Sequence, residues 1–137
     1  MKKLLKISSW LAIVAGMLMI VGGVWAICFT YRNITQEKIV TPADPSIPHT
    51  PVRGPFTLKS QADIIRHHVL KTTDGRTYAE MSRTDENRPL WVTATTLTTA
   101  LNLGIITYVF SGFILLFGLI SVWTGVVFHL LSKMKNI

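Results

Sequence analysis

Two long stretches without a charged side chain constrain this sequence more than any other feature. No Asp, Glu, Lys or Arg occurs in the 25 residues between Lys6 and Arg32, nor in the 44 residues between Arg88 and Lys133. A soluble domain of 137 residues has too little interior to hide both stretches from water. The sequence therefore predicts a small integral membrane protein. Its composition excludes disordered, collagen-like and disulfide-scaffold classes.

The first charge-free stretch predicts a transmembrane helix over residues 7–31. About 20 residues at a rise of 1.5 Å each cross a hydrocarbon core of ~30 Å, so this stretch is long enough. The alternative is a cleaved signal peptide, which would also begin with a basic segment such as residues 1–6. The apolar core of a signal peptide has only ~7 to 15 residues and is followed by a small-residue cleavage site. We therefore expect the span to be retained.

The second charge-free stretch predicts one helix over residues 89–131, whose second half is transmembrane. Its strongly apolar part runs from Leu103 to Leu131. The threonine-rich residues before it are expected to extend the helix outside the hydrocarbon. Pro89 fits the first turn of such a helix, where the missing N–H of proline is not needed.

The charges around the two stretches predict an orientation. The basic ends, residues 1–6 and 132–137, contain five lysines and no acidic residue, whereas the segment between the spans holds nine basic and seven acidic residues. Lysines in short flanks stay on the cytoplasmic side of the membrane. We therefore expect a multi-pass protein of the plasma membrane, with both termini cytoplasmic and residues 32–102 extracytoplasmic.

Small residues recur every seven positions in both predicted spans. The two rows are Ser9, Gly16, Gly23 and Thr30 in the first span, and Gly104, Ser111, Gly118 and Gly125 in the second. Helices in lipid associate where small side chains let the backbones approach. The interval of seven predicts a left-handed antiparallel contact, although glycine is also common in membrane helices in general. A second small pair, Gly22 and Ala26, suits the helix of a partner protein.

Residues 32–55 are predicted to form an extended, proline-rich segment. Four prolines recur at every third position: Pro42, Pro45, Pro48 and Pro51. A polyproline II helix has three residues per turn, so these prolines would line one edge. Such an edge suits either the aromatic groove of a recognition module or a semi-rigid spacer, and both interpretations stay open.

Residues 56–88 are predicted to form a small, mostly α-helical and irregular extracytoplasmic domain. Ser60 is the expected N-cap of an amphipathic helix, with Asp63 in its first turn and a turn at Asp74 and Gly75 that ends it. One face of this helix is apolar and consists of Leu58, Ala62, Ile65 and Val69. This segment is too short to build much of a core alone, so we expect it to rest on the helix before the second span and on the membrane surface.

Three residues, Asp63, His67 and His68, are weak candidates for a metal or catalytic site. Asp63 and His67 are four positions apart and share a helix face, whereas His68 points ~100° away from His67. One carboxylate and one imidazole are fewer than the three or four ligands that zinc takes. The single cysteine, Cys28, provides neither an intramolecular disulfide nor a cysteine zinc site, and nucleophile, phosphate-loop and dinucleotide motifs are absent. We expect no catalytic residue, no metal and no cofactor, and no nucleic-acid partner.

Several motifs in residues 54–80 carry a resemblance to known proteins: Gly54-Pro55-Phe56-Thr57, Gln61-Ala62-Asp63-Ile64-Ile65, His68 and Thr77-Tyr78-Ala79-Glu80. With these motifs the chain resembles, over nearly its whole length, a family of small actinobacterial two-span membrane proteins of unknown function. Members of that family are sometimes labelled automatically as aromatic ring-opening dioxygenases. A non-haem iron enzyme needs two histidines and a carboxylate that converge on the metal. The resemblance therefore implies a topology and a plasma-membrane location, and it assigns no catalytic residue.

The sequence favours a non-enzymatic accessory or interaction subunit of an envelope or membrane protein complex. Its expected partners are the lipid bilayer and another membrane protein, and a homo-oligomer stays open. Two alternatives remain. One is a metal-dependent enzyme, or a subunit of one, that uses Asp63, His67 and His68; the other is a sensor that presents the proline edge to a partner.

Overall fold

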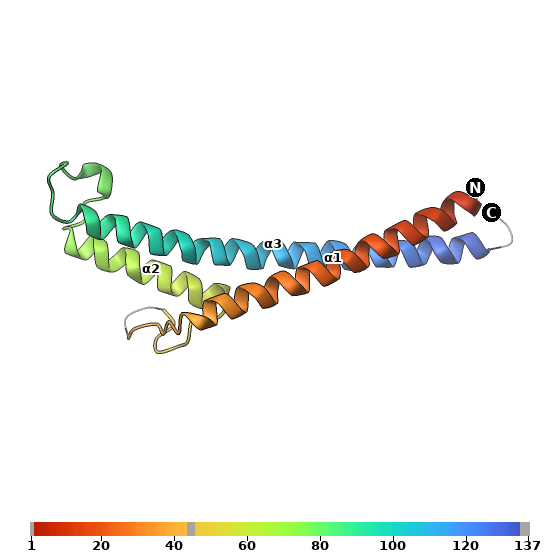
Figure 1. The fold of residues 1–137 in the computed structure, drawn as a ribbon, viewed down its shortest axis with the longest axis horizontal. Helices are drawn as coiled ribbons and strands as arrows, with labels where there is room; N and C mark the ends of the chain where they lie inside the picture. Colours follow the sequence, from red (N-terminus) through yellow and green to blue (C-terminus); the bar gives the residue numbers. More distant parts are fainter. Residues whose placement is uncertain (1, 44–45, 135–137) are drawn as a thin grey trace. The chain divides into compact units, whose positions relative to one another are not determined.

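The computed structural model describes residues 2–43 and 46–134, and most of these residues are helical. The elements in chain order are α1 (Lys2–Gln36), α2 (Pro55–Thr72), the short 3₁₀ turn η1 (Tyr78–Glu80) and α3 (Arg88–Lys133) (Figure 1). The chain divides into two compact units. Unit 1 consists of Met1–Phe29 and Val109–Ile137, and unit 2 consists of Thr30–Tyr108. Both α1 and α3 contribute residues to each unit.

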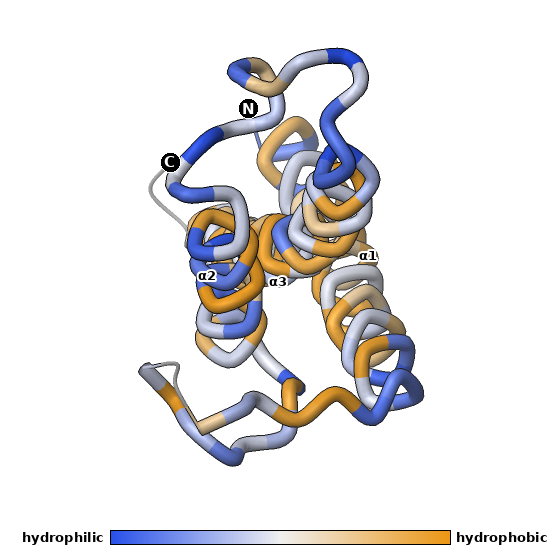
Figure 2. Tube along the Cα trace, turned by 90° about the vertical axis from the view of Figure 1, so that its left-hand side faces the viewer, coloured by the Kyte–Doolittle hydropathy of each residue, from blue (hydrophilic) through white to orange (hydrophobic). Residues whose placement is uncertain are grey.

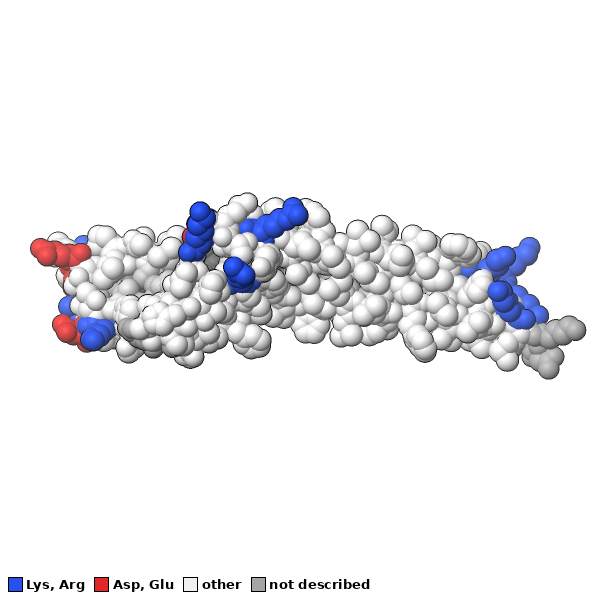
Figure 3. Space-filling view, turned by 90° about the horizontal axis from the view of Figure 1, so that it is seen from below, with Lys and Arg blue, Asp and Glu red and all other residues white. Residues whose placement is uncertain are grey.

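Both α1 and α3 are long and apolar enough to cross a membrane. Only 11% of the most apolar window of each helix is buried, whereas the core helix of a soluble protein would be mostly buried. Large apolar side chains face outward instead, as for Trp25 and Trp123, which are 66% and 71% exposed. On the face shown in Figure 3, the surface of unit 1 is uncharged up to the lysines at the helix ends.

The helices extend past the predicted spans. α1 includes the basic residues before position 7 and continues five residues beyond position 31, and α3 begins one residue before Pro89. Charged side chains limit how much of a helix can lie in the hydrocarbon of a bilayer. Lysine, arginine and glutamine are nevertheless good helix formers, so the helix itself continues past the predicted span. Residues 135–137 of the predicted basic tail lie outside the described residues.

Two apolar clusters form the core of unit 2. The first contains the buried residues Val52, Leu58, Ala62 and Leu101, and the second contains Val69, Met81, Trp91 and Ala94. Ile65 of α2 packs against both clusters. Figure 2 shows the hydrophobic and hydrophilic residues that α2 carries. Because Leu101, Trp91 and Ala94 belong to α3, the predicted small domain does complete its core with the helix before the second span.

The start of α2 differs from the prediction. Ser60 does not cap the helix: α2 begins at Pro55 with Gly54 as N-cap, and the Thr57 hydroxyl accepts a hydrogen bond from the Gly54 N–H. Ser60 is instead buried within the helix, and its hydroxyl accepts a hydrogen bond from the Ile47 N–H. Proline is favoured in the first helical turn, and this preference places the start six residues earlier than predicted.

Hydrogen bonds hold the connection between α2 and α3. After α2 the chain turns through two left-handed residues, Asp74 and Gly75 (φ 51° and 78°), as the sequence predicted. The buried Thr73 hydroxyl donates to the Arg76 carbonyl oxygen at 2.7 Å, and the same oxygen accepts a hydrogen bond from Trp91 Nε1 at 3.1 Å. These bonds fasten the turn to α3.

The proline-rich segment is not the extended edge that the sequence predicted. Its first residues complete α1, and the chain then reverses, so that Val40 and Pro51 form an isolated antiparallel bridge. The Thr41 hydroxyl accepts a hydrogen bond from the Thr50 N–H, and His49 adopts a left-handed conformation (φ 49°). These local bonds favour a closed loop over a polyproline II helix, which has no internal hydrogen bonds.

Candidate functional site

The two glycines at the middle of the small-residue rows lie opposite each other in unit 1. A Cβ atom added to Gly16 would lie 2.6 Å from the Gly118 carbonyl oxygen, and one added to Gly118 would lie 2.9 Å from the Gly16 carbonyl oxygen. Real Cβ atoms essentially never come this close to another heavy atom. The backbones of α1 and α3 therefore touch here, and no larger side chain fits without moving a helix.

The same contact repeats one heptad away in each direction. A Cβ on Gly125 would lie 2.8 Å from the Ser9 carbonyl oxygen, and the buried Ser9 hydroxyl donates to the Gly125 carbonyl oxygen at 2.8 Å. A Cβ on Gly23 would lie 3.2 Å from the carbonyl oxygen of Ser111, which is also buried. The partners advance by seven residues along α1 and recede by seven along α3, as antiparallel helices require.

One end of each row, Thr30 in α1 and Gly104 in α3, belongs to unit 2. Thr30 is buried there. A Cβ on Gly104 would lie 3.2 Å from a methyl group of Leu58 and 3.5 Å from one of Ile34, so side chains of both α1 and α2 press on this glycine. Gly104 thus provides space for the core of unit 2.

Sequence reasoning missed a second hydroxyl between the helices. The Ser121 hydroxyl donates to the Ala12 carbonyl oxygen at 2.8 Å. Ser121 lies three residues after Gly118 and therefore outside the heptad row. A serine in a span more often bonds to a carbonyl of its own helix, so its identity alone gave no signal.

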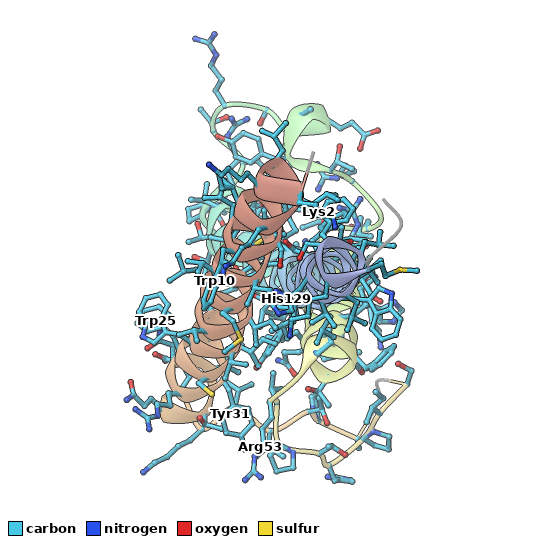
Figure 4. The ribbon with its side chains drawn as sticks, turned by 90° about the vertical axis from the view of Figure 1, so that its right-hand side faces the viewer. Lys2, Trp10, Trp25, Tyr31, Arg53 and His129 are labelled. Carbon is cyan, nitrogen blue, oxygen red and sulfur yellow. The ribbon has the colours of Figure 1, made fainter. Side chains whose placement is uncertain are left out.

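The outward face of α1 in unit 1 carries aromatic rings. Trp25 and Phe29 stack with ring centroids 5.4 Å apart, and both are exposed. Figure 4 shows Trp25 projecting away from α3. Gly22 lies on an open part of the same helix, because a Cβ added to it would meet nothing within 4 Å.

The three weak candidates for chemistry, Asp63, His67 and His68, lie on the exposed side of α2. The Asp63 carboxylate pairs with Lys59, and the two imidazole rings are tilted with centroids 6.2 Å apart. Within residues 2–43 and 46–134, no three His, Cys, Asp or Glu side chains gather closely enough to hold a metal ion.

Of the four prolines considered for partner binding, Pro48 and Pro51 are exposed and Pro42 is half-buried. Pro45 lies outside the described residues. The reversal of the chain places Pro51 beside Val40, so Pro42 and Pro51 do not share one straight edge.

A carboxylate caps the η1 turn. Glu80 accepts hydrogen bonds from the Thr77 N–H at 2.6 Å and from the Thr77 hydroxyl at 2.8 Å. These bonds stabilise the charged form and lower the pKa of Glu80, the backbone bond more than the hydroxyl bond. Glu80 therefore caps this turn in its ionised form.

Comparison of the chain with models of protein families, with characterised proteins and with solved structures finds no match. The resemblance to small two-span membrane proteins stays a prediction.

Proposed function

We propose that this chain is a two-span protein of the plasma membrane, with both termini cytoplasmic and residues 32–102 outside. In this proposal α1 and α3 form a transmembrane hairpin, and the protein is a non-enzymatic accessory subunit of a membrane or envelope protein complex. Unit 2 is then a small extracytoplasmic domain.

The distribution of side chains in unit 1 supports membrane insertion. Small and hydroxyl-bearing residues occupy the contact between the helices, while tryptophan, phenylalanine and leucine side chains point outward. Water would favour the opposite arrangement, because exposed apolar patches of this extent promote association. Lipid favours this one, because the helices gain by close packing and the apolar side chains contact acyl chains.

The open surface around Gly22 is the observation that supports a membrane-protein partner. The Gly16 side of α1 is filled by α3, but the Gly22 side leaves space beyond the glycine. Ala26 lies four residues further along α1, and small residues at this spacing let a second transmembrane helix approach closely. The stacked Trp25 and Phe29 rings provide apolar contacts beside it.

The test is purification of the full chain from membranes in a mild detergent, followed by mass spectrometry of the proteins that copurify. We expect a stoichiometric membrane protein, and we expect Gly22→Leu to reduce its recovery at least fivefold. Gly112→Leu is the matched control, because Gly112 is an equally open glycine on α3. Recovery of a second copy of this chain alone would replace the accessory role by a homo-oligomer. Equal recovery with both variants would remove Gly22 from the interface.

A further inference from the structure

Unit 2 contains an apolar cavity of about 540 Å³ between its three helices. α1 contributes Ile34, α2 contributes Leu58 and Ile65, and α3 contributes Leu97 and Leu101. Leu58 and Leu101 are buried, so the cavity reaches the core of the unit. Ligand sites usually have volumes of ~300 to 1,000 Å³ and mostly apolar linings with a few polar groups. This cavity has the dimensions and lining of such a site.

One polar lining residue has an unsatisfied acceptor. Gln61 lines the cavity, and its Oε1 atom is buried without a hydrogen-bond partner. Leaving a buried polar atom unpaired is costly, so a donor that reaches it gains more than an ordinary exposed hydrogen bond provides. The terminal torsion of glutamine is broad, so this oxygen can turn toward a ligand in the cavity that the side chain already lines.

The charge of the lining restricts the head of the ligand. Among the described residues that line the cavity, Glu37 is the charged one, and Asn33 and Gln61 are the other polar ones. A carboxylate at this position repels an anionic head such as that of a fatty acid. It accepts hydrogen bonds from hydroxyl groups.

The cavity lies next to the strongly apolar parts of the two predicted spans. Ile34 lies two residues after Arg32, and Leu101 lies two residues before Leu103. This step rests on the membrane topology proposed above. If the helices span the bilayer in that way, an acyl chain of the outer leaflet moves only a short distance to enter the cavity. A volume of about 540 Å³ suits one chain rather than a two-chain phospholipid.

We propose that this cavity binds a single-chain lipid with a neutral, hydroxyl-bearing head, of the monoacylglycerol class. The acyl chain packs against Leu58, Leu97 and Leu101, and a head hydroxyl donates to Gln61 Oε1. The protein would thereby hold a specific neutral lipid at the outer surface of the membrane.

The test uses the full chain in phosphatidylcholine nanodiscs with a photoactivatable diazirine monoacylglycerol. After irradiation, peptide mapping should find the label in residues 58–65 and 97–101. Unlabelled 1-monoolein should compete roughly five- to tenfold more effectively than methyl oleate, which has the same chain but no donor. Oleate should compete less well than 1-monoolein, because Glu37 repels it.

Two pairs of variants control this experiment. Gln61→Met keeps the length of the side chain and should make 1-monoolein and methyl oleate equal, whereas Gln36→Met, outside the cavity lining, should leave their ratio unchanged. Leu97→Trp should fill the cavity and abolish the label, whereas Leu90→Trp should not. Leu97 and Leu90 are both partly exposed on α3, and circular dichroism checks that each variant stays helical.

The proposal is overturned if the label is confined to the spans, if methyl oleate competes as well as 1-monoolein, or if Leu97→Trp leaves the label unchanged. Labelling displaced by a copurified protein instead of by 1-monoolein would identify the cavity as a protein-docking site and also overturn it. Failure of membrane insertion would be seen separately, as release of the chain from membranes by alkaline carbonate.

Discussion

At the residue scale, the glycines of unit 1 are the positions where one added side chain should do most harm. Gly118→Leu places a branched side chain where a Cβ alone already lies 2.9 Å from the Gly16 carbonyl oxygen and from Ile20 Cγ1. The helices must separate, and we expect a loss of about 1–3 kcal/mol of stability. Thermal unfolding in a mild detergent, followed by circular dichroism, measures the loss.

The neighbouring residue provides the control for this change. Phe117 is exposed on the outer face of α3, so Phe117→Leu should lower the melting temperature much less. Equal effects of the two substitutions would show that the glycine contact does not hold the hairpin together.

Also at the residue scale, Glu80 should titrate below its ordinary pKa of 4.5. Because the pKa is lower in the folded chain, the carboxylate stabilises the η1 turn fully above the ordinary pKa. That stabilisation is lost as the pH falls through the lowered value. Thr77→Ala removes the hydroxyl donor and should raise the pKa part of the way toward 4.5. NMR of the glutamate carboxyl carbon measures the shift, and Thr84→Ala, whose hydroxyl contacts Ser82 instead, should leave it unchanged.

At the scale of elements, α2 is expected to act through packing rather than through chemistry. Ile65 is half-buried and packs against both apolar clusters of unit 2, so Ile65→Asp would place an unpaired carboxylate against them and cost about 1–3 kcal/mol. His67 is exposed, and His67→Ala should be nearly silent. Thermal unfolding of both variants, with analysis of bound metal, measures the difference. Stoichiometric zinc or iron that is lost in His67→Ala while the fold survives would support the enzyme hypothesis instead.

The sequence predicted the helices of this fold well because their signals are long. The two uncharged stretches and the apolar face of α2, which recurs every three or four residues, each involve several residues, so single exceptions do not hide them. The Ser60 cap was wrong because Ser60 and Asp63 have the spacing of a helix start, whereas the helix begins six residues before that, with Gly54 as N-cap and Pro55 in the first turn. The proline loop was mispredicted because its closure depends on the Thr41 hydroxyl, which the spacing of the prolines does not reveal.

The cavity was not predicted for a related reason. Its walls come from three helices that are far apart in the sequence, and each contributes only a few ordinary apolar residues. No periodicity marks such residues, since core and cavity linings have the same composition. Gln61 would have been the one useful signal, as a long polar side chain next to Ala62 on the apolar side of α2.

At the scale of the whole molecule, the lysines at the two ends predict the topology. In a chain with Cys28→Ala, a cysteine introduced at exposed Lys71 should react with a membrane-impermeant maleimide on intact cells. A cysteine introduced at Lys3 should react only after the cells are lysed. The reverse pattern would place unit 2 in the cytoplasm and would contradict the proposed location of both the domain and the lipid cavity.

The serine hydroxyls of unit 1 also limit how the hairpin can move. One bond runs from α1 to α3, from Ser9 to the Gly125 carbonyl oxygen, and one runs from α3 to α1, from Ser121 to that of Ala12. A shift of about 1–2 Å of one helix along the other, such as occurs at some helix interfaces, would disturb both bonds. It would also place larger side chains opposite each glycine. The next register that pairs glycine with glycine is seven residues, or ~10 Å, away. These contacts therefore oppose sliding of α1 along α3 within unit 1, and a tilt or rotation of both helices together is the motion that they permit.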